Sequence, residues 1–357
     1  MHNMIFDLQH FADAGTLVNA TGGFVNAHTG AASAFDNSHS LTAELKAFYD
    51  TELLENARTE LFYAQFAKRQ PLPANHHGLV EWRKWNTFDK AAKLTEGVIP
   101  TGQKFGVTAV TGSIDQYGTY TAVTDRLELR AYDDVILGAT EEMGASAAET
   151  QEALIRDALY TNTNVLYCDK ITRADGSVAA TPTQQSGLAE DATYHCHLTP
   201  EMVNKAVTVM KKNRVPRIGG KYYAVIHPSV AHDLRADAGW IEAHKYAQPE
   251  EIFNGEIGEL HGVRFIENVF APVIRGANDP IAVYASYFFG KDSFGIIDPE
   301  GGALEMIIHD KGEIGGPLNQ FSTIGYKFET NGATILYPER LLRVMSTSSF
   351  SGTDAAN

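Results

Sequence analysis

Three strand-forming segments within residues 79–124 have no obvious means of burying one another. They are rich in Thr, Val, Tyr and Trp and span residues 79–85, 105–111 and 117–123. Between the first two lies a stretch of turn composition, residues 95–102. The pattern predicts a long two-stranded ribbon with a loop at its tip. Because a ribbon of two strands is marginal in water by itself, it needs a surface to lie on.

The composition is globular, and the charge disfavours binding to nucleic acid. Of 357 residues, 44% are apolar and 20% are charged, which suits one large domain or a few smaller ones. Lys and Arg total 29 and Asp and Glu total 44, giving a net charge of −15. Phosphate affinity depends on cations, so we expect only weak, non-specific contact with DNA. Two cysteines fit a reducing cytoplasm, and no apolar run is long enough to predict a membrane span.

The first 45 residues read as an extended arm. The first Lys or Arg is Lys46, so the segment has neither the positive start of a secretory leader nor the arginines of a transit peptide. It is rich in Gly, Ala, Asn, Ser and Thr, with scattered apolar residues, a composition that favours no regular element. We expect the arm to be disordered or held by a neighbouring subunit.

Four segments show helical patterns. Apolar residues recur every four positions over 41–68, and a longer apolar face runs over 133–166, weakened near its start by glycines. At 199–213, Thr, Pro and Glu form a strong helix start, and a short helix is expected at 228–236. Between the second and third of these helices, residues 169–197 are polar and predict a loop or small hairpin.

Strands dominate the second half of the chain, so the sequence predicts an α+β fold. Buried or alternating strand patterns lie at 222–226, 263–266, 281–287, 303–308, 322–328 and 334–337. Residues 346–357 are expected to form a polar tail.

Phosphate-binding and nucleophile motifs are absent from the sequence. There is no G-x-x-x-x-G-K-[ST], no G-x-G and no G-x-S-x-G. The nearest string, residues 290–295, places Ser293 at the wrong spacing for a nucleophile elbow, and a turn at a strand end is the better interpretation. We assign no catalytic or cofactor-binding residue.

Histidines and cysteines give only weak metal signals. His195 and His197 could share one side of a strand, and His76 and His77 form a second pair. A zinc site needs about four convergent ligands, and no second half-site accompanies either pair. Cys168 and Cys196 are expected to be free, buried thiols. We therefore assign no metal ligand.

Charged clusters are expected to be structural. The paired acids Asp133–Asp134, Glu141–Glu142 and Glu250–Glu251 fit helix starts or polar faces. The basic cluster at 211–217 follows a helix end, where cations are favourable, and could contact a phosphate backbone or an acidic neighbour. The acidic character of the chain favours the neighbour.

Several strings, in this order and spacing, carry a resemblance to a known family. They are the helix at 48–57 with the FAKRQPLP stretch at 66–73, LTEGVIP at 94–100, IDQYGTY at 114–120, GGPLNQ at 315–320 and GYK at 325–327. Together they resemble the major capsid proteins of tailed bacteriophages, most closely the family typified by the coat protein of the podovirus N-four. The opening IFDLQHFA at 5–12 is similar to the start of capsid proteins from phages of Gram-positive hosts.

The resemblance implies the Johnson fold and a division of the chain into structural parts. An extended N-terminal arm would span 1–40, a helix and connector 41–78, and an extended ribbon loop 79–124. A peripheral domain with a long spine helix would span 125–197, an axial domain 198–280, and return strands of the peripheral domain with the tail 281–357.

The implied function is a major capsid protein that self-assembles, as hexamers and pentamers, into an icosahedral head shell enclosing double-stranded DNA. Because the ribbon begins by about residue 79, no fused scaffolding domain fits before it, and a separate scaffolding protein is implied. A portal protein at one vertex and decoration proteins are further implied partners. Some relatives crosslink a ribbon lysine, but Lys84, Lys90, Lys93 and Lys104 match no such site. The implied location is the virion, after assembly in the host cytoplasm.

Two alternatives remain open at this point. An encapsulin-like nanocompartment shares the fold but holds a cargo enzyme. The neighbouring genes would distinguish it from a phage capsid, since portal and terminase genes indicate a phage. A soluble enzyme of unknown class predicts a compact oligomer with a convergent polar pocket. The physical argument favours a shell, because Trp82, Trp85 and Phe88 on the ribbon need a neighbouring subunit for burial.

Overall fold

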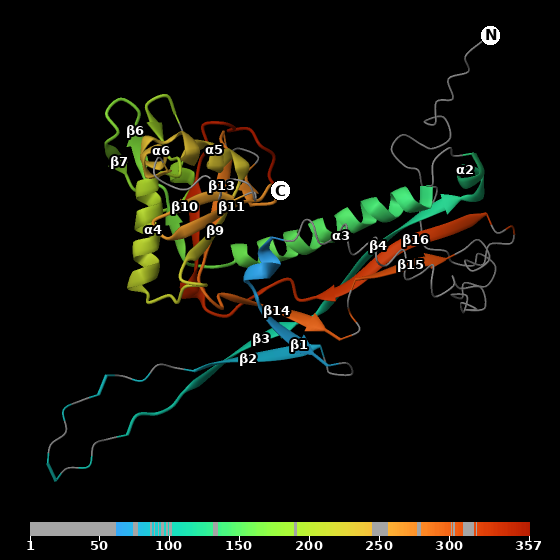
Figure 1. Ribbon diagram of the computed structural model, residues 1–357, viewed down its shortest axis with the longest axis horizontal. Coiled ribbons are helices and arrows are strands. Elements are labelled where there is room, and N and C mark those ends of the chain that lie inside the picture. Colours follow the sequence, from blue (N-terminus) through green and yellow to red (C-terminus); the bar gives the residue numbers. More distant parts are fainter. Residues whose placement is uncertain are drawn as a thin grey trace. The chain divides into compact units, whose positions relative to one another are not determined.

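The computed structural model describes residues 62–73, 78–85, 88, 90–91, 93, 96–97, 99, 102–130, 135–188, 191–244, 256–276, 280–300, 302, 304–309, 318 and 320–357. They divide into two compact units (Figure 1). The first contains the described residues of 114–151 and 298–330, and the second contains those of 62–113, 152–297 and 331–357. The expected arm at 1–40 and most of the helix expected at 41–68 lie outside the described residues.

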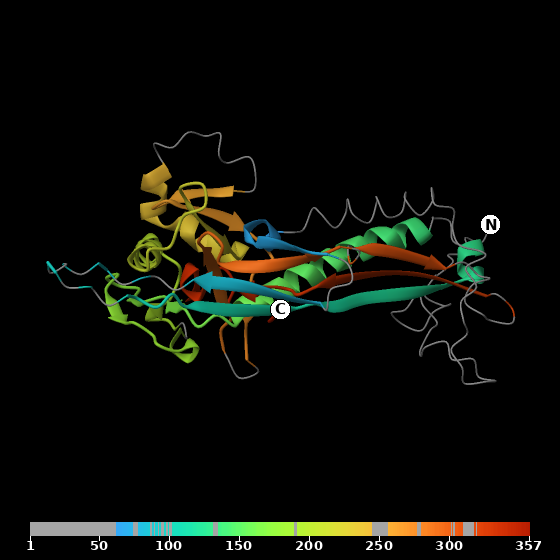
Figure 2. The same ribbon diagram turned by 90° about the horizontal axis from the view of Figure 1, so that it is seen from below.

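The first unit is built on a three-stranded antiparallel sheet in the order β15-β16-β4. Strand β16 (Phe321–Thr330) pairs with β4 (Asp115–Thr124) along its full length, and β15 (Glu305–His309) lies on its other side. Figure 2 shows β4 and β16 running side by side. We expected β4 to belong to the ribbon. It pairs with β16 instead, where Gly325 and Gly118 allow the two backbones to approach closely.

Two helices follow β4 in the chain. The short α2 spans Asp125–Arg130, and the long α3 spans Val135–Tyr160. Within the first unit, the Ser146 hydroxyl lies 3.1 Å from the Tyr326 hydroxyl, which joins α3 to β16. We expected the long helix to reach residue 166, but it ends six residues earlier. Asn162 donates its side-chain amide to the carbonyl oxygens of Leu341 (2.6 Å) and Pro338 (3.3 Å), which favours an irregular segment there.

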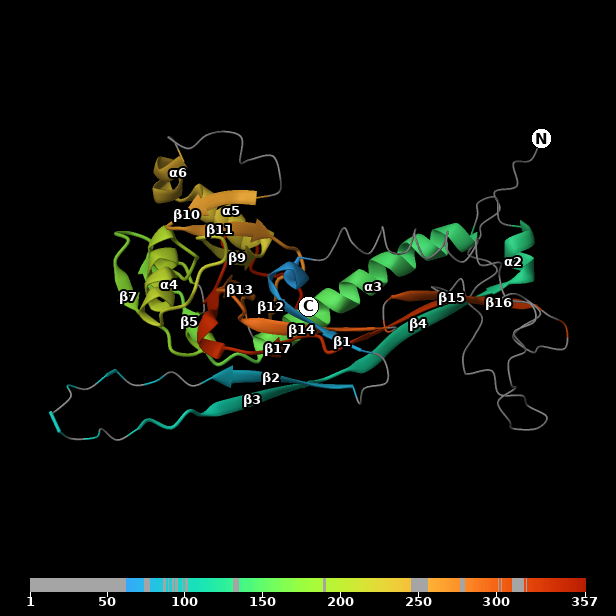
Figure 3. The same cartoon turned by 60° about the horizontal axis from the view of Figure 1, so that its bottom comes forward.

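The second unit is organised around a seven-stranded mixed sheet. Its order is β10-β11-β9-β13-β18-β5, with β12 paired to β13 (Figure 3). The strands are β5 (Val165–Tyr167), β9 (Tyr222–Ile226), β10 (Glu256–Leu260), β11 (Val263–Glu267), β12 (Val273–Ile274), β13 (Val283–Phe289) and β18 (Leu341–Ser346). Every residue of β13 is buried, which explains its continuous apolar sequence, since both faces of the sheet are covered.

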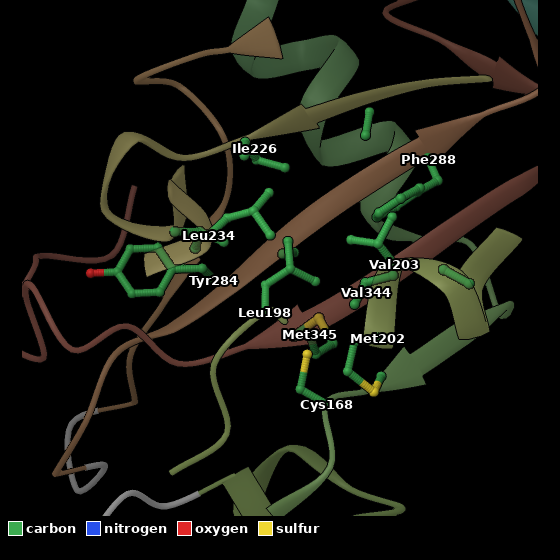
Figure 4. Close-up of a cluster of buried hydrophobic side chains, with 14 of the residues drawn as sticks. Cys168, Leu198, Met202, Val203, Ile226, Leu234, Tyr284, Phe288, Val344 and Met345 are labelled. Carbon is green, nitrogen blue, oxygen red and sulfur yellow. The ribbon is translucent and has the colours of Figure 1, made fainter. Parts of the chain in front are cut away.

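One face of this sheet is covered by α4 (Pro200–Lys212), α5 (Pro228–Ala236) and α6 (Ala238–His244). Side chains from α4 and α5 pack there against β9, β13 and β18, as Figure 4 shows for Met202, Leu234, Phe288 and Val344. The predicted start of α4 is confirmed, because the Thr199 hydroxyl accepts a hydrogen bond from the Met202 N–H at 3.3 Å. On the opposite face, Tyr287 and Phe289 pack with Tyr63 and with Leu159 at the end of α3.

Three smaller sheets complete the second unit. The ribbon pairs β2 (Leu79–Trp85) with β3 (Val107–Ser113). A second sheet has the order β1-β14-β17, with β1 at Lys68–Leu72, β14 at Phe294–Pro299 and β17 at Thr334–Ile335. The third is β7-β6-β8, formed by Val178–Ala180, Lys170–Thr172 and Tyr194–His195, and the 3-10 turn Gln185–Leu188 lies between β7 and β8 along the chain. It occupies the segment in which we predicted a loop or small hairpin.

The structure corrects two sequence expectations at the ends of this unit. We expected helix up to residue 68, but Tyr63–Phe66 is a single 3-10 turn and Lys68–Leu72 is strand. We also expected residues 281–357 to form return strands of the peripheral domain and a polar tail. Instead, β13 and β18 complete the sheet of β9 and β11, and Asp354 binds the hydroxyls of Ser229 and Tyr284. No helix among the described residues is long and apolar enough to cross a membrane.

Candidate assembly surface on the ribbon

The base of the ribbon is fixed to the rest of the second unit by Trp82. This residue is only 7% exposed, and its ring lies against the backbones of Gly112 and Gly295. A methyl group added at either glycine would come within 2.8 Å or 2.9 Å of the ring, so the contact requires both glycines. We expected Trp82 to await a neighbouring subunit. It is buried within its own chain and anchors the ribbon.

A charged contact reinforces this anchor. The Lys84 Nζ lies 3.0 Å from a carboxylate oxygen of Glu339 and 4.6 Å from the centre of the Tyr337 ring, and the Arg340 guanidinium lies 3.7 Å from the same ring centre. Burial acts to raise the pKa of Glu339, but its hydrogen bonds to the backbone and to Lys84 outweigh burial and lower that pKa. The ribbon base is therefore held by packing and by charge.

The outer part of the ribbon carries an aromatic patch, formed by Trp85, Phe88 and Phe105. The Trp85 and Phe105 rings stack with centroids 4.5 Å apart, and those of Phe88 and Phe105 are 5.2 Å apart. Each of the three side chains remains 54–56% exposed, and Ile99 beyond them is 94% exposed. Apolar groups gathered and exposed in this way make the patch a candidate surface for contact with another protein. This is the arrangement expected of Trp85 and Phe88.

The serine singled out in the sequence lies in a buried turn. Ser293 precedes β14, and its carbonyl oxygen accepts hydrogen bonds from the N–H groups of Leu336 (3.0 Å) and Tyr337 (3.1 Å). Its hydroxyl makes no hydrogen bond among the described residues, so no base activates it there. The prediction of a turn at a strand end is confirmed.

The histidines and cysteines do not combine into a metal centre within the described ranges. His195 and His197 do lie together, with ring centroids 4.8 Å apart, but no group of three potential ligands occurs in the part of the chain that the structure describes. His76 and His77 fall outside that part. Cys168 and Cys196 are both buried in the sheet core and form no disulfide, as predicted. Burial, with the nearby Cys196, raises the pKa of Cys168 well above its ordinary value.

The acidic pairs and ribbon lysines show no convergent chemistry among the described residues. Glu141 and Glu142 are exposed on α3, as expected of a polar helix face. The other two acidic pairs lie outside the described residues. Lys90, Lys93 and Lys104 are exposed on the ribbon, whereas Lys84 is engaged by Glu339. The basic cluster at 211–217 is exposed except at Val215, which is buried.

Sequence reasoning missed the partners that hold the ribbon base. Glu339 is 255 positions from Lys84, and Gly295 is also far from Trp82 along the chain. No local signal connects such residues, since neither a helical period nor a turn motif relates them. Gly295 lies on β14 and Glu339 in the turn Pro338–Arg340, and only the folded chain brings them beside the ribbon.

Comparison with known proteins identifies the fold. Residues 108–332 match the family model described as phage capsid protein. The capsid structure of Helicobacter pylori bacteriophage KHP30 superposes with a TM-score of 0.60 at 10% identity, covering 93% of this chain and 100% of that chain. The cyanophage Pam1 capsid gives 0.59 at 13% identity, covering 92% and 100%, and the Ralstonia phage GP4 capsid gives 0.56 at 13% identity, covering 94% and 100%. No curated protein matches.

The family match and the fold agree with the mixed α+β architecture expected of a tailed-phage capsid subunit. They favour a phage head shell over the encapsulin-like compartment, and they indicate a structural rather than an enzymatic role. The chain belongs to the phage capsid protein family and serves as a major capsid protein of the head shell.

Proposed function

We propose that copies of this chain assemble as hexamers and pentamers into an icosahedral shell around the double-stranded DNA of a tailed bacteriophage. The aromatic patch on the anchored ribbon carries this proposal, because three stacked rings that are more than half exposed need a partner surface. A sister subunit offers that surface at every position of a closed ring. Contacts that are modest one by one then add up over the shell.

The parts of the chain take roles in this proposal that follow their boundaries in the fold. The ribbon, 79–113, and the N-terminal arm, 1–40, lie across neighbouring subunits. The sheet of β4, β15 and β16 with α3 forms the peripheral domain. The unit that contains α4, α5 and the seven-stranded sheet forms the axial domain around the symmetry axes, and it includes β13 and β18.

Other partners follow from the same proposal. A separate scaffolding protein directs assembly in the host cytoplasm, a portal protein occupies one vertex, and decoration proteins bind the finished virion. Packaged DNA contacts the shell weakly, because a subunit with a net charge of −15 repels phosphate and lets DNA slide during packing and ejection. A strongly basic inner surface in the assembled particle would contradict this last point.

Electron microscopy of the purified protein, expressed with and without its scaffolding partner, tests the proposed function. Closed shells of uniform size are expected in the presence of the partner, with hexameric and pentameric rings visible in averaged images. Analytical ultracentrifugation tests for the result that would contradict the proposal. A stable, protease-resistant monomer under all conditions, with its ribbon protected, would refute the proposal.

A further inference from the structure

Three segments of the second unit join to form a basic edge. They are the loop after α4, the turn at 290–292 and the turn Pro338–Arg340. The Lys291 N–H donates to the Pro216 carbonyl oxygen at 3.0 Å, the Gly290 N–H donates to that of Arg340 at 2.8 Å, and Arg340 Nη1 donates to the Lys291 carbonyl oxygen at 3.0 Å. The cations of this basic edge are Lys211, Lys212, Arg214, Arg217, Lys291 and Arg340.

The charges of the basic edge are largely uncompensated. Apart from Arg340, all of these side chains are exposed, and among the described residues none of the five forms an ion pair with a carboxylate. The sequence contains no Asp or Glu between Met202 and His232. The nearest acids along the three segments are Asp292 and Glu339, and Glu339 is already engaged by Lys84. This concentration of positive charge stands out in a chain whose net charge is −15.

Packing holds the loop of the basic edge in one conformation. Val215 is buried against Gly290, where a Cβ would come within 2.1 Å of a Val215 methyl group. The Tyr222 hydroxyl donates to the Val215 carbonyl oxygen at 2.9 Å, and the Arg217 guanidinium lies 5.4 Å from the centre of the same Tyr222 ring. A surface fixed in this way loses little conformational entropy when it binds a partner.

We propose that the basic edge binds the acidic exposed face of α3 on a second copy of the chain. This inference rests on the proposed function, since it requires copies to assemble. Glu141, Glu142 and Glu149 are exposed and lie within about one quarter of the helix circumference. No Lys or Arg occurs on the chain between Arg130 and Arg156, so this face is purely acidic.

A contact between copies is favoured over a contact with DNA because it relieves the repulsion that assembly creates. Two subunits of charge −15 repel each other, and association needs complementary charge where they meet. A basic edge that meets an acidic helix also joins two different surfaces of the same chain. Such a heterologous contact generates a ring when its rotation closes, which suits hexamers and pentamers.

Charge reversal in the full chain, co-expressed with the scaffolding partner, tests the inference. The variant Lys211→Glu/Lys212→Glu/Lys291→Glu is expected to lower the yield of shells by about tenfold or more, since tenfold corresponds to only about 1.4 kcal/mol of contact free energy. The variant Glu141→Lys/Glu142→Lys/Glu149→Lys is expected to do the same. Combining all six substitutions restores the pairing with the charges exchanged, and shell yield should recover. Lys68→Glu, at an exposed lysine elsewhere in the second unit, is the matched control.

Two further measurements separate the possible outcomes. Circular dichroism verifies that each variant folds, and carbodiimide crosslinking of wild-type shells with mass spectrometry should join a basic-edge lysine to an α3 glutamate of another copy. The inference would be overturned if the lysine-to-glutamate variant assembled normally, or if the variant with all six substitutions failed to recover shell yield. Loss of DNA retention without loss of shells would also overturn it. If the wild type itself forms no shells, the proposed function fails instead.

Discussion

The carboxylate of Glu152 accepts a hydrogen bond from the backbone N–H of Phe62 at 2.6 Å. It also accepts one from the Tyr63 N–H at 3.1 Å and lies 3.4 Å from the side-chain amide of Asn268. Glu152 is fully buried near the end of α3, within the second unit. One helix residue thus holds the backbone at Phe62 and Tyr63 next to the core formed by Tyr63 and Phe289.

Replacement of Glu152 by Ala should destabilise the protein strongly. The buried Tyr63 N–H and the partly buried Phe62 N–H would lose their acceptor, and leaving a buried donor unsatisfied costs about 1–3 kcal/mol. Glu149→Ala is the matched control, because Glu149 is an exposed glutamate on the same helix. Urea unfolding should give a clearly lower free energy for Glu152→Ala and a nearly unchanged one for Glu149→Ala. Equal values for the two variants would show that the buried hydrogen bonds contribute little.

Because two glycines make room for the Trp82 ring, replacing one of them by alanine should destabilise the base of the ribbon. In Gly112→Ala, the new methyl group would lie 2.8 Å from the Trp82 ring and 2.7 Å from the Thr334 hydroxyl, so one of them must move. Overpacking of this kind typically costs about 1–3 kcal/mol. At Gly102, a Cβ meets no atom within 4 Å, and Gly102→Ala should leave stability nearly unchanged. Unfolding followed by tryptophan fluorescence measures the free energy of unfolding of both variants. An unchanged value for Gly112→Ala would mean that the ribbon base is not tightly packed.

Local signals made α4 predictable, and their absence concealed β18. Thr199, Pro200 and Glu201 announce the start of α4 within three consecutive residues, and the helix begins there. Strand β18 lies inside the largest sheet, between β13 and the edge strand β5, yet it is short and its partners are distant along the chain. Register with a remote strand is a property of the packed core, and a single sequence does not encode it locally.

On the ribbon, too, the sequence predicts some features of the candidate surface, and only the fold reveals the others. The exposure of Trp85 and Phe88 follows from a ribbon too thin to cover them, so sequence reasoning predicted it correctly. The burial of Trp82 depends on Gly295, which only the fold brings beside it. The predicted polar tail at 346–357 is likewise attached by a residue that is remote along the chain. Its anchor, Asp233, accepts hydrogen bonds from the Ser349 N–H and hydroxyl across more than a hundred residues.

His227 caps the start of α5 and should make the stability of the protein depend on pH. Its Nδ1 accepts a hydrogen bond from the Ser229 N–H at 3.2 Å, which caps the helix, and burial lowers its pKa below the ordinary 6.5 despite the opposing charge of Asp354. Protonation would remove the acceptor and place a positive charge at a helix N-terminus, where it is unfavourable. The folded state thus binds fewer protons than the unfolded state, and stability falls as the pH drops below about 6.5.

The variant His227→Asn should remove this pH dependence. Asparagine caps helices without titrating, so its free energy of unfolding should stay nearly constant between about pH 7.5 and 5.5. The wild type should lose stability over the lower part of that range. The range stays above the region in which Asp354 titrates, because hydrogen bonds from Ser351 and Tyr284 lower the pKa of that carboxyl from 3.8. A variant that follows the wild-type curve would assign the pH dependence to another group.

The aromatic patch should matter for assembly far more than for folding. In Trp85→Ser/Phe105→Ser, the lost stacking of side chains that are already 54% and 56% exposed should reduce stability by only about 1 kcal/mol. The same change removes much of the apolar surface that a sister subunit would cover, so shells should become rare while the soluble subunit persists. Val178→Ser, at a side chain 52% exposed on β7, is the matched control and should assemble normally. Sedimentation with electron microscopy measures the amounts of shells and of soluble subunit in one preparation. Normal shells from the double variant would exclude the patch as an assembly contact.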